Sequence, residues 1–187
     1  HKRLNHFVRE EGFVDTDFLL VMKMKQGDEE AFDKFVRKYY GEILKYCKYH
    51  CFDTEYAMDL AQETFLHFFT SLSEYRYKGK TKNYLYTIAG NLCKNYYKKK
   101  KEAPMEGEGL ETASVLPVNP LDTVVERVTV ETAINKLPEE FKEVVILYYF
   151  QGLKLMEIAD VLKIGLPLVK YRLGQARKRL KQMLEHV

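Results

Sequence analysis

The sequence has few cysteines and no long apolar run. Its three cysteines are an odd number without the spacing of a disulfide framework, which indicates a reducing compartment. No apolar run approaches the roughly 18 residues that a membrane-spanning helix needs, and no signal-peptide pattern is present. We therefore expect a cytoplasmic protein that does not insert into a membrane.

A complete set of catalytic or metal-binding residues is also missing. Asp59 and Glu63 could form an acid–base or metal-binding pair, but no nucleophile, third carboxylate or substrate-pocket signature accompanies them. Cys47, His50 and Cys51 could offer metal ligands, yet a fourth ligand is lacking nearby. Two core thiols and a surface histidine are the favoured interpretation. We expect no enzymatic activity, no metal and no cofactor.

Acidic residues are absent between Arg76 and Lys101, whereas nine Lys or Arg lie there. Such a surface favours anionic polymers, because each neutralised phosphate releases counterions. Amide and aromatic side chains among the amines can also hydrogen-bond to exposed bases and stack on them. The stretch from Asp59 to Lys101 is therefore predicted to handle nucleic acid.

Helical periodicity divides this stretch into two helices joined by a basic loop that contains a glycine. Each helix has an apolar stripe that is expected to be buried, and Phe65 belongs to the first stripe. On the first helix, another face carries Asp59, Gln62, Glu63 and Leu66. On the second helix, the corresponding face carries Tyr84, Thr87, Asn91, Lys94, Asn95 and Lys98.

The flanking segments suggest how the chain is divided. A short helix is expected to break at Gly27, after which Asp28 offers an N-cap for a longer helix. Residues 102–123 are rich in proline, glycine and acids, the composition of an extended, flexible linker. We therefore expect an all-α protein with two small helical domains, residues 1–101 and 124–187, joined by this acidic linker.

The C-terminal part has the pattern of a helix-turn-helix domain. Pro138 and the glutamates after it start a helix that ends at Gly152. A short helix over 156–162, a turn over 163–165 and a long basic helix over 166–184 follow. Two helices joined by a three-residue turn, the second of them basic, form the arrangement that places a helix in the major groove.

The faces of the long helix divide its polar residues into two groups. Its buried stripe is expected to be formed by Val169, Leu173, Ala176 and Leu180. Lys170 and Tyr171 point away from that stripe and are expected to contact base edges. Phosphate contacts are expected from Arg172, Arg177 and Lys178.

Several motifs occur in a fixed order across both predicted domains. The first domain has Asp28-Glu-Glu-Ala-Phe32, Asp59-Leu-Ala-Gln-Glu-Thr-Phe65 and Tyr84-Leu-Tyr-Thr-Ile-Ala-Gly-Asn91. The second domain has Leu137-Pro138-Glu139, Tyr149-Phe-Gln-Gly-Leu153, Glu157-Ile-Ala159, Val169-Lys170, Arg172-Leu173 and Ala176-Arg-Lys-Arg-Leu180. In this order the chain resembles the extracytoplasmic-function (ECF) sigma factors of the sigma-70 family. These are promoter-specificity subunits of bacterial RNA polymerase.

The resemblance implies roles for the matching positions. Those that match the helix docking on the polymerase β′ clamp are Asp59, Gln62, Glu63 and Phe65. Those that match the surface capturing and holding the −10 element are Tyr75, Arg76, Lys78, Lys80, Tyr84, Asn91, Lys94, Asn95 and Lys98. Those on the helix that matches the −35 reader are Pro167, Lys170, Tyr171, Arg172, Arg177 and Lys178. The implied partners are the polymerase core, through its β′ clamp and β flap, promoter DNA and an anti-sigma factor.

The sequence departs from the family pattern at a few positions. Tyr84 stands where many members have tryptophan, although tyrosine still stacks on bases. Lys163 replaces a usual turn glycine, and Gly165 a usual N-capping serine or threonine. The alternative hypothesis is a free-standing helix-turn-helix regulator with a ligand-sensing N-terminal domain. It explains the C-terminal domain but not the basic surface of the first domain.

Overall fold

The computed structural model describes residues 15–51, 53–102 and 124–185, and the side chains of 97, 99–102 and 124–129 are left out of the description. Throughout these ranges the ordered elements are helices, and no strand occurs among them. The chain divides into two compact units, His1–Pro104 and Met105–Val187. The expected all-α class with two small helical units is confirmed. None of the helices in the described ranges has the length and apolar character to cross a bilayer.

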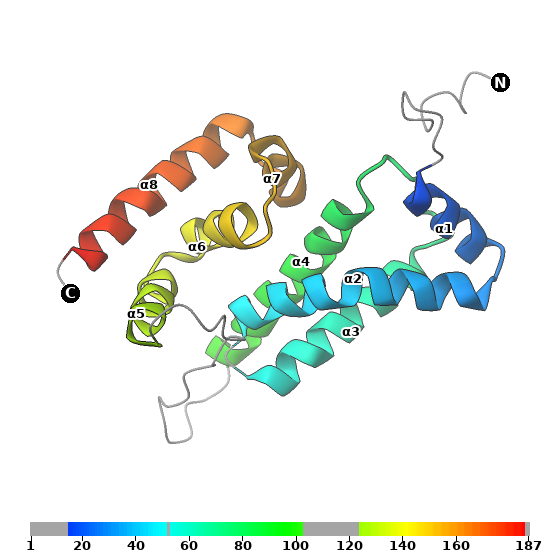
Figure 1. The fold of residues 1–187 in the computed structure, drawn as a ribbon, viewed down its shortest axis with the longest axis horizontal. Helices are drawn as coiled ribbons and strands as arrows, with labels where there is room; N and C mark the ends of the chain where they lie inside the picture. The colour runs from blue at the N-terminus through cyan, green and yellow to red at the C-terminus, as the bar shows by residue number, and fades with distance from the viewer. Residues whose placement is uncertain (1–14, 52, 103–123, 186–187) are drawn as a thin grey trace. The chain divides into compact units, whose positions relative to one another are not determined.

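The first unit begins with two helices (Figure 1), and each of them starts at an aspartate cap. Helix α1 (Thr16–Lys25) is capped by Asp15, whose carboxylate accepts from the backbone N–H of Asp17 at 2.9 Å. Gly27 then takes a φ of 82°, a conformation that favours glycine. Helix α2 (Glu29–His50) follows, with Asp28 accepting from the N–H of Ala31 at 3.2 Å. The sequence-based expectation of a break and a cap at these positions is confirmed.

Two further helices complete the first unit. Helix α3 (Thr54–Thr70) starts at Asp53, whose carboxylate accepts from the N–H groups of Glu55 and Tyr56. Helix α4 (Thr81–Glu102) follows a loop. Helix α2 packs on α1, α3 and α4, and α3 packs on α4, so one core lies among the helices. In that core the rings of Phe35 and Phe68 stack with centroids 4.8 Å apart, a geometry worth about 0.5–1.5 kcal/mol beyond area burial.

The thiols and the histidine at the end of α2 are all buried. Cys47 and Cys51 have exposed fractions of 0% and 1%, as expected for core thiols. His50 was expected at the surface, but it is buried, and its ring lies 4.6 Å from that of Tyr46. Within the described residues of the first unit, no three His, Cys, Asp or Glu side chains bring their ligand atoms together.

The second unit is a small helical domain built on its last helix. Helix α8 (Leu166–Leu184) packs on α5 (Val124–Asn135), α6 (Glu139–Val145) and α7 (Leu155–Leu162). Pro138 caps α6 one position before the helix rather than lying inside its first turn. The helix then continues as a π-helical segment, η1 (Ile146–Phe150), which the sequence pattern did not predict. Such π-segments are rare and are frequent at functional sites.

The turn between α7 and α8 contains Lys163 and Gly165, the two departures from the family pattern in the second unit, and accommodates both. Lys163 adopts a left-handed conformation (φ 53°), which costs a non-glycine residue roughly 1–2 kcal/mol. Ile164 completes the turn by donating its backbone N–H to the carbonyl of Ala159 at 3.1 Å. Gly165 is extended (φ −68°), and Pro167 lies in the first turn of α8, where its fixed φ suits the helix.

Candidate nucleic-acid interface

One face of α4 carries the amides and amines that were predicted to hold a DNA strand. These side chains are exposed: Asn91, Lys94, Asn95 and Lys98. Thr87 and Tyr84 lie half-buried one and two turns before Asn91, respectively, at the spacing that continues the same face. The opposite side of α4 is buried and is formed by Leu85, Tyr86, Ala89 and Cys93. The predicted residues of α4 therefore share one accessible surface.

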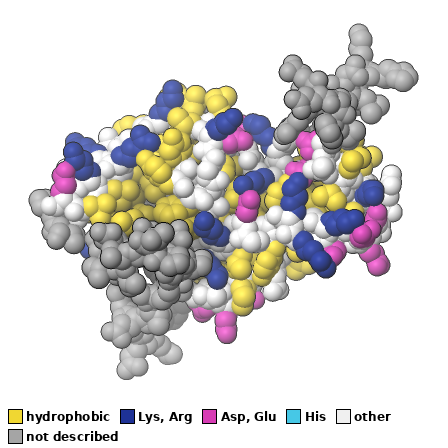
Figure 2. Space-filling model, viewed as in Figure 1, with side chains coloured by type: hydrophobic (Ala, Val, Ile, Leu, Met, Phe, Trp, Pro, Cys, Tyr) yellow, Lys and Arg dark blue, Asp and Glu magenta, His cyan; other side chains and the backbone are white. Residues whose placement is uncertain are grey.

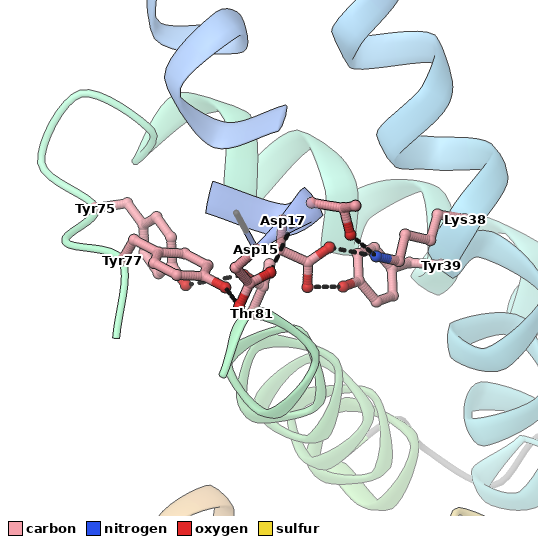
Figure 3. Close-up of polar contacts among 8 residues, drawn as sticks. Asp15, Asp17, Lys38, Tyr39, Tyr75, Tyr77 and Thr81 are labelled. Atoms are coloured by element: carbon pink, nitrogen blue, oxygen red, sulfur yellow. Dashed lines mark hydrogen bonds and ion pairs between the residues drawn. The ribbon is translucent and has the colours of Figure 1, made fainter. Parts of the chain in front are cut away.

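A pair of stacked tyrosines stands at the N-terminal end of this face. The rings of Tyr75 and Tyr84 stack with centroids 5.0 Å apart and planes inclined by 26°. The Tyr75 hydroxyl donates to the Thr81 hydroxyl at 3.4 Å (Figure 3). Burial raises the pKa of Tyr75 above its ordinary value. Phe68 of α3 meets both rings edge-on from the core side.

The loop between α3 and α4 contributes cations around this pair. Arg76, Lys78 and Lys80 are exposed, and Gly79 turns the chain with a φ of 73°. Lys82, in the first turn of α4, forms an ion pair with Glu42 of α2 at 2.5 Å and is thereby partly neutralised. The space-filling view shows Lys and Arg side chains interspersed with apolar, neutral and acidic ones on the visible face (Figure 2). Exposed cations such as Arg76, Lys78 and Lys80 favour an anionic strand, because each neutralised phosphate releases counterions.

A second surface, on α3, carries most of the residues that were predicted to meet the polymerase. Asp59, Gln62 and Glu63 are exposed on one side of the helix. Phe65, given a polymerase-docking role above, is only 4% exposed and packs against Phe35 in the core. Its docking role is corrected, because a buried ring supports the helix from beneath and offers no area to a partner. Leu66 is 63% exposed beside the acids, and the helical spacing had already put it on this face.

The second unit presents the basic helix α8 as expected. Pro167, Lys170, Tyr171 and Lys178 are exposed, and Arg172 is half-buried. The inner side of the helix is formed by Val169, Leu173 and Ala176, all of them buried. Leu180 is half-buried rather than buried, near the C-terminal end of the helix. The residues predicted to contact DNA thus lie away from the core of the unit.

Arg177 is held in place by two tyrosines that sequence reasoning did not assign to the site. Its Nε–H donates to the Tyr149 hydroxyl at 2.7 Å. Its guanidinium carbon lies 5.6 Å from the ring centroids of both Tyr148 and Tyr149. Both tyrosines belong to η1, and their rings are nearly perpendicular. The guanidinium group is therefore oriented by contacts within the second unit, and a guanidinium presents further N–H donors that can bind a phosphate. The adjacent tyrosines in the sequence were the only signal for this cluster.

Comparison with known proteins identifies both units. A family model described as Sigma-70 region 2 matches residues 35–103, and one described as Sigma-70, region 4 matches residues 127–180. The ECF RNA polymerase sigma factor SigW of Bacillus subtilis (strain 168) is 31% identical over 176 residues, which cover 88% of this chain and 94% of the relative. The chain belongs to the ECF sigma factors of the sigma-70 family. The resemblance noted in the sequence is confirmed.

Other relatives agree with this assignment. The RNA polymerase sigma factor YlaC of the same bacterium is 32% identical and covers 82% of this chain and 91% of its own. The solved structure of CnrH with the cytosolic domain of CnrY has a TM-score of 0.70 at 20% identity, covering 92% of this chain and 99% of that one. The sigma factor RpoE of Bartonella quintana, solved with the anti-sigma factor NepR, has a TM-score of 0.68 at 20% identity, covering 82% and 96%. At that identity the structures establish the shared fold.

The family assignment decides between the two functional hypotheses. A sigma factor is a promoter-specificity subunit of bacterial RNA polymerase and is not itself an enzyme. This function accounts for a first unit with a basic, aromatic surface, which a free-standing regulator leaves unexplained. The chain therefore directs transcription initiation by recognising promoter DNA at its −35 and −10 elements.

Proposed function

We propose that this sigma factor divides promoter recognition between the α4 face of the first unit and helix α8 of the second. The face of α4, with the loop before it, captures the −10 element, and α8 reads the −35 element in the major groove. The exposed side of α3 docks on the β′ clamp of the polymerase, and the second unit meets the β flap. In this proposal the protein supplies recognition and strand capture and has no catalytic activity of its own.

The observation that carries the −10 proposal is the continuity of one exposed surface in the first unit. The stacked Tyr75 and Tyr84 rings adjoin a row of amides and amines that extends along α4. Aromatic rings can stack on unpaired bases, amides can read base edges, and amines can hold phosphates. Asn91, two turns after Tyr84, is the amide that we assign to the extruded base. Lys94, Asn95 and Lys98 then follow the strand.

The −35 proposal rests on the accessible side of α8. Lys170 and Tyr171 are exposed near the N-terminal end of the helix, the part that usually contacts base edges in this motif. Lys178 and Arg177 lie further along the helix, where phosphate contacts fix the register. Tyr149 and Tyr148 orient Arg177 for this contact.

An anti-sigma factor is a further proposed partner. The Bartonella quintana relative was solved with one, and a protein that covers either recognition surface would keep this sigma factor from promoters. Residues 102–123, the proposed linker between domains 1–101 and 124–187, lie almost wholly outside the described residues. We propose that this linker threads toward the polymerase active site.

Transcription with reconstituted components tests the proposed function. Core polymerase, with and without this protein, is supplied with genomic fragments, and transcript start sites are mapped. We expect starts only with the protein present, downstream of a shared pair of −35 and −10 elements. Binding of promoter duplex by the protein alone, equal to binding with core, would instead favour a free-standing regulator.

A further inference from the structure

The loop that precedes α4 is fastened to helix α1 at two points. At one point the Tyr77 hydroxyl donates to a carboxylate oxygen of Asp15, 62 residues earlier in the chain (Figure 3). At the other, the ammonium group of Lys25 donates to the backbone carbonyls of Tyr75 at 2.7 Å and Ser73 at 3.3 Å. Since Asp15 caps the start of α1 and Lys25 ends it, both ends of one helix hold the same loop.

The carboxylate of Asp15 serves two purposes with its two oxygens. One oxygen accepts from the backbone N–H of Asp17 and caps α1, while the other accepts from Tyr77. Burial, and then the hydrogen bond to Asp15, raise the pKa of Tyr77. The Tyr77 ring also lies 5.6 Å from the ring of Phe18, which adds an apolar contact to the polar one.

Helix α1 is itself fixed to the core helix α2. The Asp17 carboxylate accepts from the Tyr39 hydroxyl and from the ammonium group of Lys38, which lie side by side on α2 (Figure 3). Lys38 also donates to the Thr16 hydroxyl at 3.4 Å. Charge-assisted hydrogen bonds of this kind are stronger than neutral ones. The loop is thus tied through α1 to the rigid part of the unit.

The direction of the loop side chains depends on this fastening. Arg76 and Lys78 are exposed, whereas Tyr77 between them is turned toward α1 and is half-buried. Tyr75 and Tyr77 are both half-buried, so burial alternates along this part of the loop. The hydrogen bond to Asp15 holds Tyr77 toward α1, and the two cations beside it are exposed. The Lys25 contact in turn fixes the backbone of Tyr75, the residue that stacks on Tyr84.

We propose that Asp15, Lys25 and Tyr77 are positioning residues for −10 recognition. Helix α1 holds the loop in the orientation that is needed to discriminate between bases. The proposal rests on the proposed function of the loop. None of the three residues needs to touch DNA: they act by keeping Tyr75, Arg76 and Lys78 in place.

The test measures base preference with holoenzyme reconstituted from core polymerase. Templates carry a pre-melted −10 bubble with each of the four bases in turn at the extruded position. Binding to each template gives the ratio between the best and the worst base. For Tyr77→Phe, which keeps the ring and removes the donor, we expect this ratio to fall about tenfold, as for the loss of one charge-assisted hydrogen bond. Affinity for core polymerase is expected to stay unchanged.

Two further variants separate positioning from folding. Asp15→Ser keeps a good N-cap residue for α1 but is too short to serve Tyr77 as well, so it should lower the ratio like Tyr77→Phe. Combining Asp15→Ser with Tyr77→Phe should add little, because the two remove one interaction. Tyr40→Phe is the matched control and should keep the wild-type ratio. Tyr40 is a half-buried tyrosine of α2 and is not one of the three positioning residues.

The outcomes distinguish failure of this positioning proposal from failure of the proposed −10 recognition on which it rests. Asn91→Ala is measured on the same templates as a variant of the recognition surface itself. If Asn91→Ala changes the ratio while Tyr77→Phe and Asp15→Ser do not, the positioning role is refuted, and −10 recognition by the α4 face stands. If none of the three substitutions changes the ratio, the assignment of −10 recognition to the α4 face is refuted. The positioning role, which rests on that assignment, fails with it. A fall in base preference that occurs equally in Tyr40→Phe would also refute the positioning role, since it would reflect a loss of stability.

Discussion

The rings of Tyr75 and Tyr84 stack on each other, with centroids 5.0 Å apart, although the two residues are nine positions apart in the chain. Phe68 supports both rings, with centroids at 5.2 Å from Tyr75 and 6.1 Å from Tyr84. Because the pair is already ordered, an unpaired base that joins the stack meets fixed rings and pays less for ordering them. We therefore propose that Tyr84, at a position where many family members have tryptophan, stacks on a base as part of a two-ring platform with Tyr75.

The exposed acids of α3 are predicted to be needed for polymerase and not for DNA. Exchanging Asp59 and Glu63 together for lysine should abolish core binding, because the charge of the docking face is reversed while its buried side is unchanged. Leu66→Ala should weaken core binding as well, since 63% of this side chain is exposed. Pull-down of core polymerase by each variant measures the effect.

The control for this exchange reverses two other acids. Glu30 and Asp33 are exposed on α2, and each forms an ion pair with the residue four positions later. Exposed pairs of this kind contribute about 0–1 kcal/mol, so Glu30→Lys with Asp33→Lys should fold and bind core normally. Core binding that survives the α3 exchange, or that is lost equally in the control, would show that the docking face lies elsewhere.

The two proposed classes of contact on α8 predict different losses. Lys170→Ala should cost about 1–3 kcal/mol and relax the preference at one −35 position, because a base-edge contact is removed. Lys178→Ala should weaken all sequences alike and lower the slope of log affinity against log salt by about one. Holoenzyme binding to a set of −35 variants at several salt concentrations measures both. A sequence-selective loss from Lys178→Ala would mean that the helix is rotated about its axis.

Removal of the Arg177–Tyr149 hydrogen bond should weaken DNA binding, although no charge is removed. Tyr149→Phe should weaken binding to all −35 sequences by about 1 kcal/mol, because Arg177 loses the partner that orients it. Tyr148→Phe is the matched control: its ring lies at the same 5.6 Å from the guanidinium carbon, but the Nε–H donates to Tyr149. Equal losses from both substitutions, in the same binding assay, would remove the hydroxyl from the explanation.

The helices could be predicted from the sequence because their signals are local. Leu166–Leu184 matches the predicted long helix, since both the apolar spacing and the proline in its first turn lie within the segment itself. Asp28 was predicted as a cap for the same reason. Phe65 shows the limit of motif matching: its helical position already put it on the buried stripe, and the family resemblance gave it a contact that burial forbids.

The contacts that position the site could not be predicted in this way. Tyr77 meets Asp15 across 62 residues and Arg177 meets Tyr149 across 28, and no periodicity reports such partners. The π-helical segment that carries Tyr149 differs from an α-helix by one residue in its hydrogen bonding, which leaves the apolar pattern nearly unchanged. The residues that we propose to contact bases could be chosen from local patterns and motifs, whereas the residues that orient them could not.

Limited proteolysis tests the proposed division of the chain. The proline-, glycine- and acid-rich composition of residues 102–123 predicts that the first cuts fall between Glu102 and Asn119. Two resistant fragments should result, close to residues 17–101 and 124–187, and mass spectrometry identifies their ends. First cuts between residues 55 and 95 would contradict the boundary, because α3 and much of α4 lie there.

Asn91 carries the most specific prediction for the −10 surface. Its side chain is exposed on α4, two turns beyond Tyr84, and an amide that both donates and accepts can read the hydrogen-bonding edge of an extruded base. Asn91→Ala should cripple opening of a duplex promoter, because the flipped base loses its partner. On a template with a pre-melted −10 bubble the defect should shrink, since the enzyme no longer has to separate the strands.

Permanganate footprinting of thymines in the bubble measures the first effect, with wild type and Asn91→Ala compared on the same duplex. Preference at the −10 base, measured on the pre-melted templates, should still relax, because reading the edge is separate from opening the duplex. Asn135→Ala, which removes an exposed amide at the end of α5, should alter neither quantity. Unchanged thymine reactivity together with unchanged −10 preference would remove Asn91 from the site and leave that amide as a solvated residue of α4.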